Sequence, residues 1–192
     1  MLNRMIMLMA TSKPDQDIKI HITRDFRDIK FKLTDLRKLI KIICDRFGTN
    51  EYNNTNASAN KYEISIVIVD DIEFEKINHR FLGRKSISDC LSFDLSDSNE
   101  ADSLKHFELV INGQMALRQS ALRGHSDEAE LALYMTHALL HNFGFDDREP
   151  AMARNMHEQE DEILQELGYG LVYNKRMDSS ETRNMSKRKN KK

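Results

Sequence analysis

The chain has 192 residues, of which 31% are charged, and its formal net charge is -2 at pH 7. This length is enough for one domain with a sizeable core. The nearly balanced charge excludes a strong overall positive field, so any binding to nucleic acid must be local. No stretch of the sequence approaches the roughly 20 apolar residues that a membrane span requires.

The two cysteines, Cys44 and Cys90, both lie in apolar patterned segments. We expect small buried thiols in a reducing compartment, which favours a cytoplasmic protein. Residues 1–16 are predicted to be a flexible extension, because their apolar run is shorter than that of a signal peptide. Residues 178–192 have the composition of a disordered basic tail. The folded domain is therefore predicted to span residues 17–170.

The first half of the chain predicts strands and helices in alternation. Residues 18–22 alternate apolar and polar side chains, as a strand with one buried face does. Residues 33–47 show helical spacing, with Thr34 as the expected N-cap and Gly48 as the stop. A solvated loop is expected up to residue 61. Residues 62–69 form a strand whose apolar end is covered on both faces, and a helix between Asp70 and Gly83 follows.

The second half predicts two more strands and three helices. The segment of residues 84–93 leads into a third strand, a fourth strand covers residues 107–111, and a short helix covers residues 114–122. A longer helix begins at Ser126 with acidic residues in its first turn, where they suit the helix dipole. A final helix covers residues 151–167 and stops at Gly168. We therefore predict an α/β (α+β) fold, a single domain with a small mixed four-stranded sheet packed with helices.

The longer helix ends on the motif His-Ala-Leu-Leu-His-Asn-Phe-Gly-Phe-Asp-Asp, residues 137–147. His137 and His141 are four positions apart, so both imidazoles can point at one ion from the same helix face. Two such histidines alone are often structural. Gly144, however, can end the helix and turn the chain back toward them, and Asp147 then supplies a carboxylate.

Two histidines and one carboxylate form a three-ligand zinc set that leaves the fourth position to a water molecule. Zinc lowers the pKa of such a water to about 7 and makes it a nucleophile. The sequence therefore predicts a metal site at the C-terminal end of a core helix. Asp146 competes with Asp147 for the third position, and its other expected role is a turn carboxylate that bonds its own backbone.

The motif resembles those of two families. In the metzincin type of zinc protease, the residue after the first histidine is a glutamate that acts as general base. Here that residue is Ala138, which cannot accept a proton. The motif is much more similar to that of the YbeY-type endoribonucleases, which reads His-Gly-x-Leu-His-Leu-x-Gly-Tyr-Asp-His.

The resemblance to the YbeY type covers roughly residues 18–168. Residues 77–83 and 88–93 are similar to the family segments Leu-Asn-x-x-Tyr-Arg-Gly and Thr-Asp-Val-Leu-Ser-Phe, and residues 108–111 match the next strand. Residues 124–126 match the lead into the metal helix. The last helix is similar to the closing pattern Met-x-x-x-Glu-x-x-Ile-Leu-x-x-Leu-Gly, with Glu160 in the acidic place.

The resemblance implies a single α/β domain with one Zn²⁺ per chain, held by His137, His141 and Asp147. It also implies a metal-dependent endoribonuclease that cleaves single-stranded RNA in ribosomal RNA maturation and ribosome quality control. The implied partners are single-stranded or ribosomal RNA and the ribosome or a small-subunit ribosomal protein, with no membrane.

The sequence departs from the family pattern at three positions. Asp147 stands where the family has its third histidine, although a carboxylate is an acceptable zinc ligand. Ala138 replaces a glycine, which suits a helix. Leu82 replaces an arginine that is thought to help with RNA. The nearby Arg80, Arg84 and Lys85 are therefore the candidates for substrate binding.

The expected chemistry is hydrolysis of a phosphodiester. Because the motif lacks a general base, the nucleophile is either a zinc-bound water or the 2′-hydroxyl of the substrate. His125 is a candidate acid/base helper, and its other reading is structural. Two alternative functions stay open, namely a zinc protease and a non-catalytic ribosome-associated factor. A structural zinc site would be closed by a fourth protein ligand.

Overall fold

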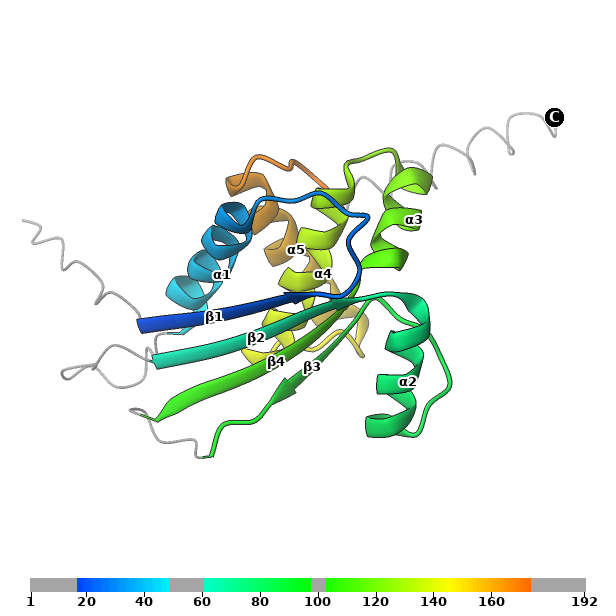
Figure 1. The fold of residues 1–192 in the computed structure, drawn as a ribbon. Coiled ribbons are helices and arrows are strands. Elements are labelled where there is room, and N and C mark those ends of the chain that lie inside the picture. The colour runs from blue at the N-terminus through cyan, green and yellow to red at the C-terminus, as the bar shows by residue number, and fades with distance from the viewer. Residues whose placement is uncertain (1–16, 49–60, 98–102, 174–192) are drawn as a thin grey trace, which may run out of the picture.

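Four strands form one mixed sheet in the part of the chain that the computed structural model describes, residues 17–48, 61–97 and 103–173. The strands are β1 (Asp17–Arg24), β2 (Lys61–Val69), β3 (Cys90–Asp94) and β4 (Leu104–Asn112). The helices are α1 (Leu33–Phe47), α2 (Asp71–Leu82), α3 (Gly113–Arg123), α4 (Asp127–Asn142) and α5 (Pro150–Glu166) (Figure 1). This architecture confirms the predicted α/β class and the small mixed sheet.

The strand order is β1-β2-β4-β3. β1, β2 and β4 run parallel, and only β3 at the edge is antiparallel to its neighbour β4. β2 therefore lies inside the sheet, as its continuous apolar end predicted. Ile66 and Ile68 point into the main core, whereas Val69 packs with α2 on the other face. A strand covered on both faces is apolar at successive positions for this reason.

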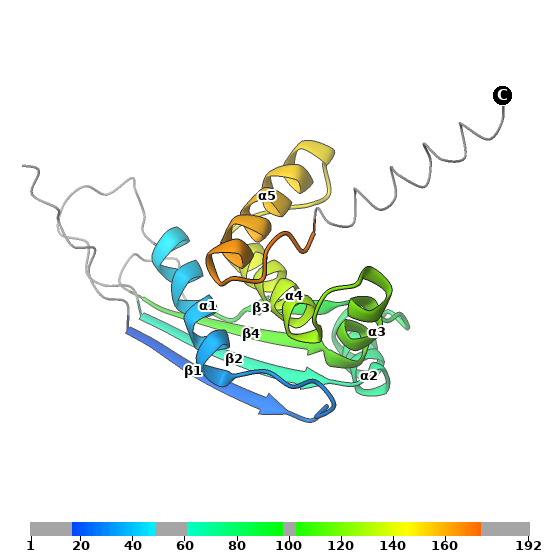
Figure 2. The same cartoon turned by 90° about the horizontal axis from the view of Figure 1, so that it is seen from above.

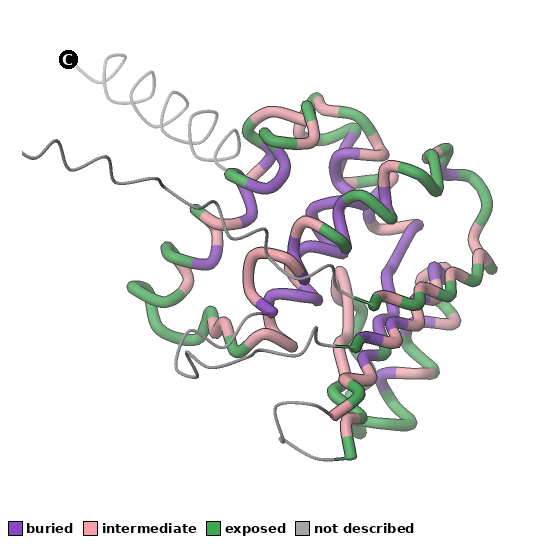
Figure 3. The backbone as a smooth tube through the Cα atoms, turned by 90° about the vertical axis from the view of Figure 1, so that its left-hand side faces the viewer, coloured by how far each residue is buried: buried purple, intermediate pink, exposed green. Residues whose placement is uncertain are grey.

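The helices form two unequal layers on the sheet. α1, α3, α4 and α5 lie over one face, and α2 lies at the other (Figures 1 and 2). The smaller cluster under α2 is built on Val69, Phe74 and Val110. Figure 3 shows the buried residues gathered between the large helical layer and the central strands. The main core thus sits on the side of the sheet that carries α4.

α4 is the central element of the large layer. It packs against α1, α3, α5, β3 and β4, and its residues from Ala129 to Leu140 are all buried except His137. The side chain of Ser126 caps its first turn by accepting a hydrogen bond from the backbone N–H of Ala129 at 3.1 Å. Such tight packing fixes the direction of the helix and thereby the place where its last turn ends.

The expected N-cap of α1, Thr34, is wrong, whereas the helix ends at Gly48 as expected. The helix begins one residue before Thr34, and its N-cap is Lys32, which makes no side-chain cap. The carboxylate of Glu128 on α4 instead accepts the backbone N–H of Lys32 at 3.0 Å. Gly48 ends the helix in a right-handed conformation with φ -79°. Its small size is what matters, because a Cβ there would lie 2.2 Å from the hydroxyl of Tyr62.

Both cysteines are free thiols, and Cys44 is buried in the main core whereas Cys90 is half-buried against it. Burial raises the pKa of Cys44 to about 12, and burial with the nearby charge of Asp89 raises that of Cys90 well above its usual value. At pH 8, a thiol with a pKa of 12 is thiolate in about one molecule in 10⁴. We therefore expect neither thiol to react with Ellman's reagent in the folded protein and both to react in guanidinium chloride. Fast reaction of either native thiol would contradict the described packing.

Several expectations concern residues outside the described ranges. The N-terminal extension, residues 49–60 of the expected loop and the basic tail all lie there. Within the described ranges, packing continues past residue 170, since Val172 is fully buried in the main core. No helix in these ranges combines the length and the apolar character needed to cross a membrane.

Candidate metal centre

The structure brings His137, His141 and Asp147 together at the end of α4. The Nε2 atoms of the two histidines are 3.1 Å apart, and Nε2 of His137 is 3.7 Å from Oδ2 of Asp147. Gly144 makes this possible, because its φ of 88° turns the chain back after the helix. Ligands at 2.0–2.2 Å from a tetrahedral ion are about 3.3–3.6 Å apart. The two separations lie close to this range, so the cluster could hold a metal ion.

The hydrogen bonds of the two imidazoles define which nitrogen of each ring carries a proton. Nδ1 of His137 is 2.7 Å from a carboxylate oxygen of Glu160, and Nδ1 of His141 is 3.0 Å from the carbonyl oxygen of Phe145. Both oxygens only accept hydrogen bonds, so both Nδ1 atoms are donors. In the neutral rings, the two facing Nε2 atoms then carry lone pairs. Lone pairs at 3.1 Å repel unless a proton or a metal ion lies between them.

Glu160 on α5 joins this centre to a third histidine. Its carboxylate is only 1% exposed and accepts hydrogen bonds from Nδ1 of His137 at 2.7 Å and from Nδ1 of His157 at 2.8 Å. Burial alone would raise the pKa of Glu160, but these two bonds lower it. Burial likewise opposes protonation of His137, yet Glu160 outweighs this and raises the pKa of that imidazole. The buried charge of Glu160 therefore favours positive charge at the centre.

A cavity of about 220 Å³ opens beside the histidines. Its wall includes two members of the cluster, His137 and Asp147, together with Glu160. The remaining lining residues come from the segment that leads into β3, from α4, from α5 and from the segment after α5, namely Asp89, Leu133, Tyr134, His157 and Tyr173. Because His137 and Asp147 line this cavity, a molecule inside it would lie beside two members of the cluster.

A model of the family described as Endoribonuclease YbeY matches residues 21–168. The chain belongs to the YbeY family. A protein named Endoribonuclease YbeY from Clostridioides difficile (strain 630) is 33% identical over 149 residues, which are 74% of this chain and 94% of the relative. One of that name from Roseiflexus sp. (strain RS-1) is 34% identical over 117 residues, 57% of this chain and 73% of the relative.

The fold of this YbeY protein is also similar to a solved structure. The solution structure of TM1509 from Thermotoga maritima aligns with a TM-score of 0.50 and 18% sequence identity. The alignment covers 78% of this chain and 88% of TM1509. At this identity the likeness concerns the fold alone, and it agrees with the sheet and helices described above.

Asp146, the competing third ligand, is not a member of the cluster of His137, His141 and Asp147. Its carboxylate accepts the backbone N–H of Arg148 at 3.0 Å and forms an ion pair with the guanidinium of the same residue. These bonds lower the pKa of Asp146. The residue is thus a turn carboxylate, and the geometry favours Asp147 as the third member of the set.

His125 does not line the cavity. Its Nε2 lies 2.5 Å from the buried carboxylate of Glu130, which also pairs with Arg123. The charge of Glu130, after burial, raises the pKa of Tyr134, and Tyr134 does line the cavity. His125 is therefore connected to the cavity wall only indirectly, through Glu130 and Tyr134.

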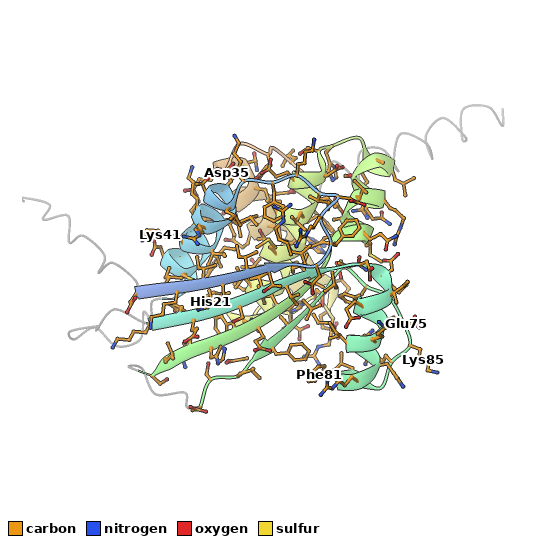
Figure 4. All side chains as sticks on the ribbon, in the orientation of Figure 1. His21, Asp35, Lys41, Glu75, Phe81 and Lys85 are labelled. Carbon is orange, nitrogen blue, oxygen red and sulfur yellow. The ribbon has the colours of Figure 1, made fainter. Side chains whose placement is uncertain are left out.

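The predicted substrate-binding cations lie on α2 and the loop that follows it. Arg80, Arg84 and Lys85 are exposed and are absent from the cavity wall, and so is Leu82. Figure 4 shows Lys85 extending outward beside the end of α2 that carries Phe81. The structure therefore does not bring these three residues into the cluster, and their role in binding RNA stays a prediction.

Sequence reasoning missed four residues of the cavity wall, namely Asp89, Tyr134, His157 and Tyr173. One signal was available, because His157 precedes Glu160 by three positions on α5, which places both side chains on one helix face. Tyr173 gave no such signal. Its place depends on how the chain folds back after α5.

Proposed function

We propose that the protein is a zinc-dependent endoribonuclease that cleaves single-stranded RNA, with one ion held by His137, His141 and Asp147. The facing pair of Nε2 lone pairs beside a carboxylate carries this proposal, together with membership of the YbeY family. Imidazole donors favour zinc over Mg²⁺ and Ca²⁺, which prefer oxygen ligands. The biological setting we propose is ribosomal RNA maturation and ribosome quality control in the cytoplasm, in contact with the ribosome.

The residues of the chain prepare the site for this chemistry. Glu160 and the carbonyl oxygen of Phe145 hold the two imidazoles in the tautomer that presents Nε2. Asp147 has a side chain that is 40% exposed and stands at the rim of the cavity, where it adds negative charge to the set. A bound zinc ion supplies Lewis-acid activation of a phosphodiester or of the attacking oxygen. The choice between water and the 2′-hydroxyl as nucleophile stays open.

The experiment that tests this function uses the purified full-length chain. We expect elemental analysis to find about one zinc per chain. We expect cleavage of a single-stranded RNA and not of the duplex of the same sequence, loss of cleavage with a chelator, and its return with added zinc. Cleavage that continues at full rate after zinc has been removed would overturn the proposal.

The two alternative functions receive less support. A zinc protease needs a general base after the first histidine, and Ala138 cannot serve. A structural zinc site would be closed by a fourth ligand, whereas the metal-ligand group found among the described residues has three members and borders a cavity. Digestion of casein would support the first alternative, and RNA binding with bound zinc but no cleavage would support the second.

Replacement of Glu160 by glutamine is expected to weaken zinc binding about 10- to 100-fold, the usual cost of losing a partner that orients a ligand. A glutamine has one acceptor oxygen, so it satisfies only one of the two Nδ1 donors and turns its amide group toward the other. Glu158→Gln, an exposed position on the same helix, is the matched control. Zinc titration with a competing chromogenic chelator measures both variants. Equal affinities for the two variants would show that Glu160 does not orient His137.

A further inference from the structure

Two stacked rings form part of the cavity wall next to the candidate metal centre. The imidazole of His157 and the phenol ring of Tyr173 have centroids 3.5 Å apart and planes inclined by 14°. The imidazole of His137 lies 6.4 Å from that of His157, with planes inclined by 15°. The three rings are therefore nearly parallel and lead from the metal centre to Tyr173.

Buried carboxylates of α5 hold the ring of His157 and the backbone of Tyr173. Glu160 accepts a hydrogen bond from Nδ1 of His157 at 2.8 Å. Asp161 is 2% exposed and accepts the backbone N–H groups of Val172 and Tyr173 at 3.1 and 3.0 Å. A buried carboxylate is costly unless such bonds satisfy it. These two acids thus hold the segment after α5 against the helix and place Tyr173 in the cavity wall.

We propose that Tyr173, supported by His157, forms a subsite for an unpaired nucleobase next to the phosphate bound at the metal centre. The inference rests on the proposed nuclease function and adds which residues bind a base of the substrate. A flat ring held in one orientation is suited to stack on a base, which every nucleotide offers whatever its sequence. Neither His157 nor Tyr173 belongs to the ligand set, and both line the cavity beside it.

This subsite also gives a physical reason for selecting single-stranded RNA. A base inside a duplex is stacked on its neighbours and paired with the opposite strand. It must lose both the stacking and the base pair before it can enter a cavity. An unpaired base gains the stack on Tyr173 at lower cost. Stacking on an aromatic side chain contributes about 5- to 150-fold in affinity per base. The selectivity then comes from ring geometry and not from the cations of α2.

The test compares Tyr173→Leu with Tyr173→Phe, which keeps the ring. Fluorescence anisotropy measures binding of a labelled single-stranded RNA octamer to each full-length protein, with zinc removed by chelator so that the RNA stays intact. We expect Tyr173→Leu to bind about tenfold more weakly and Tyr173→Phe to bind within twofold of the parent protein. With zinc present, we expect KM to rise for Tyr173→Leu while kcat and zinc content stay within twofold.

A second comparison links the effect to a base. Octamers with a single abasic nucleotide at successive positions are bound to the parent protein and to Tyr173→Leu. We expect one position at which removal of the base lowers the affinity of the parent protein about tenfold. At that position, removal of the base should not lower the affinity of Tyr173→Leu any further. If Tyr173→Leu fails to fold, the scan with the parent protein decides alone, and a flat scan overturns the subsite.

The outcomes separate this inference from the proposed function. If the parent protein neither binds nor cleaves the octamer, the nuclease proposal fails and the subsite fails with it. If the parent protein cleaves RNA and Tyr173→Leu binds and cleaves it equally well, only the subsite is wrong. Weaker binding by Tyr173→Leu together with Tyr173→Phe overturns the stacking explanation, because phenylalanine retains the aromatic face.

Discussion

Replacement of His141 by alanine is expected to remove zinc from the protein and to lower cleavage of single-stranded RNA to below about 1% of the parent rate. The imidazole supplies one of two nitrogen donors, and a single histidine with a carboxylate is a poor zinc site. His141 is the better choice than His137. Loss of His137 would also leave the buried carboxylate of Glu160 with one imidazole partner fewer. Elemental analysis and an RNA cleavage assay measure the two effects.

His21→Ala is the matched control for this variant. His21 lies on β1, on the sheet (Figure 4), and its side chain is 63% exposed. We expect its removal to change neither zinc content nor cleavage. Circular dichroism must show that both variants keep the fold of the parent protein. A His141→Ala protein that retains one zinc per chain would show that the ion is held elsewhere.

The fold was largely predictable because most of its helices and strands are determined by patterns of residues that are close in sequence. The spacing of α4, its cap at Ser126 and the turn at Gly144 depend on neighbours in sequence, and the structure confirms all three. The same holds for β2, whose continuous apolar end indicated an inner strand. Thr34 failed as a cap because the start of α1 is held by Glu128, which is 96 residues away from Lys32. Tertiary contacts of this kind leave no local signal.

The candidate site likewise contains residues placed by the local sequence and residues placed by tertiary contacts. The spacing of His137 and His141 predicted that they would meet and left Asp146 and Asp147 as competitors for the third position, and the structure brings Asp147 to the two histidines. The remaining wall of the cavity is assembled from the residue before β3, from α4 and α5, and from the segment after α5. Glu160 holds the ring of His157 and Asp161 holds the backbone of Tyr173, and these tertiary contacts leave no local pattern in the sequence.

The role of Asp147 is open to a test that uses its neighbour as control. Asp147→Ala is expected to weaken zinc binding by about 100-fold or more, since it leaves two ligands where a catalytic zinc site has three. Asp146→Ala is expected to bind zinc as the parent protein does, because the carboxylate of Asp146 is hydrogen-bonded and ion-paired to Arg148 in the turn. Zinc titration against a competing chelator compares the two variants at pH 7.5.

Asp147→His, which installs the residue that the YbeY-type pattern has here, adds a pH dependence of known sign. We expect it to bind zinc at pH 7.5. A histidine must lose its proton to act as a ligand, and its ordinary pKa is about 6.5. Zinc affinity of the variant should therefore fall more steeply between pH 7 and 6 than that of the parent protein. If Asp147→Ala binds zinc as tightly as the parent while Asp146→Ala does not, the third ligand is Asp146, and the turn must rearrange around the ion.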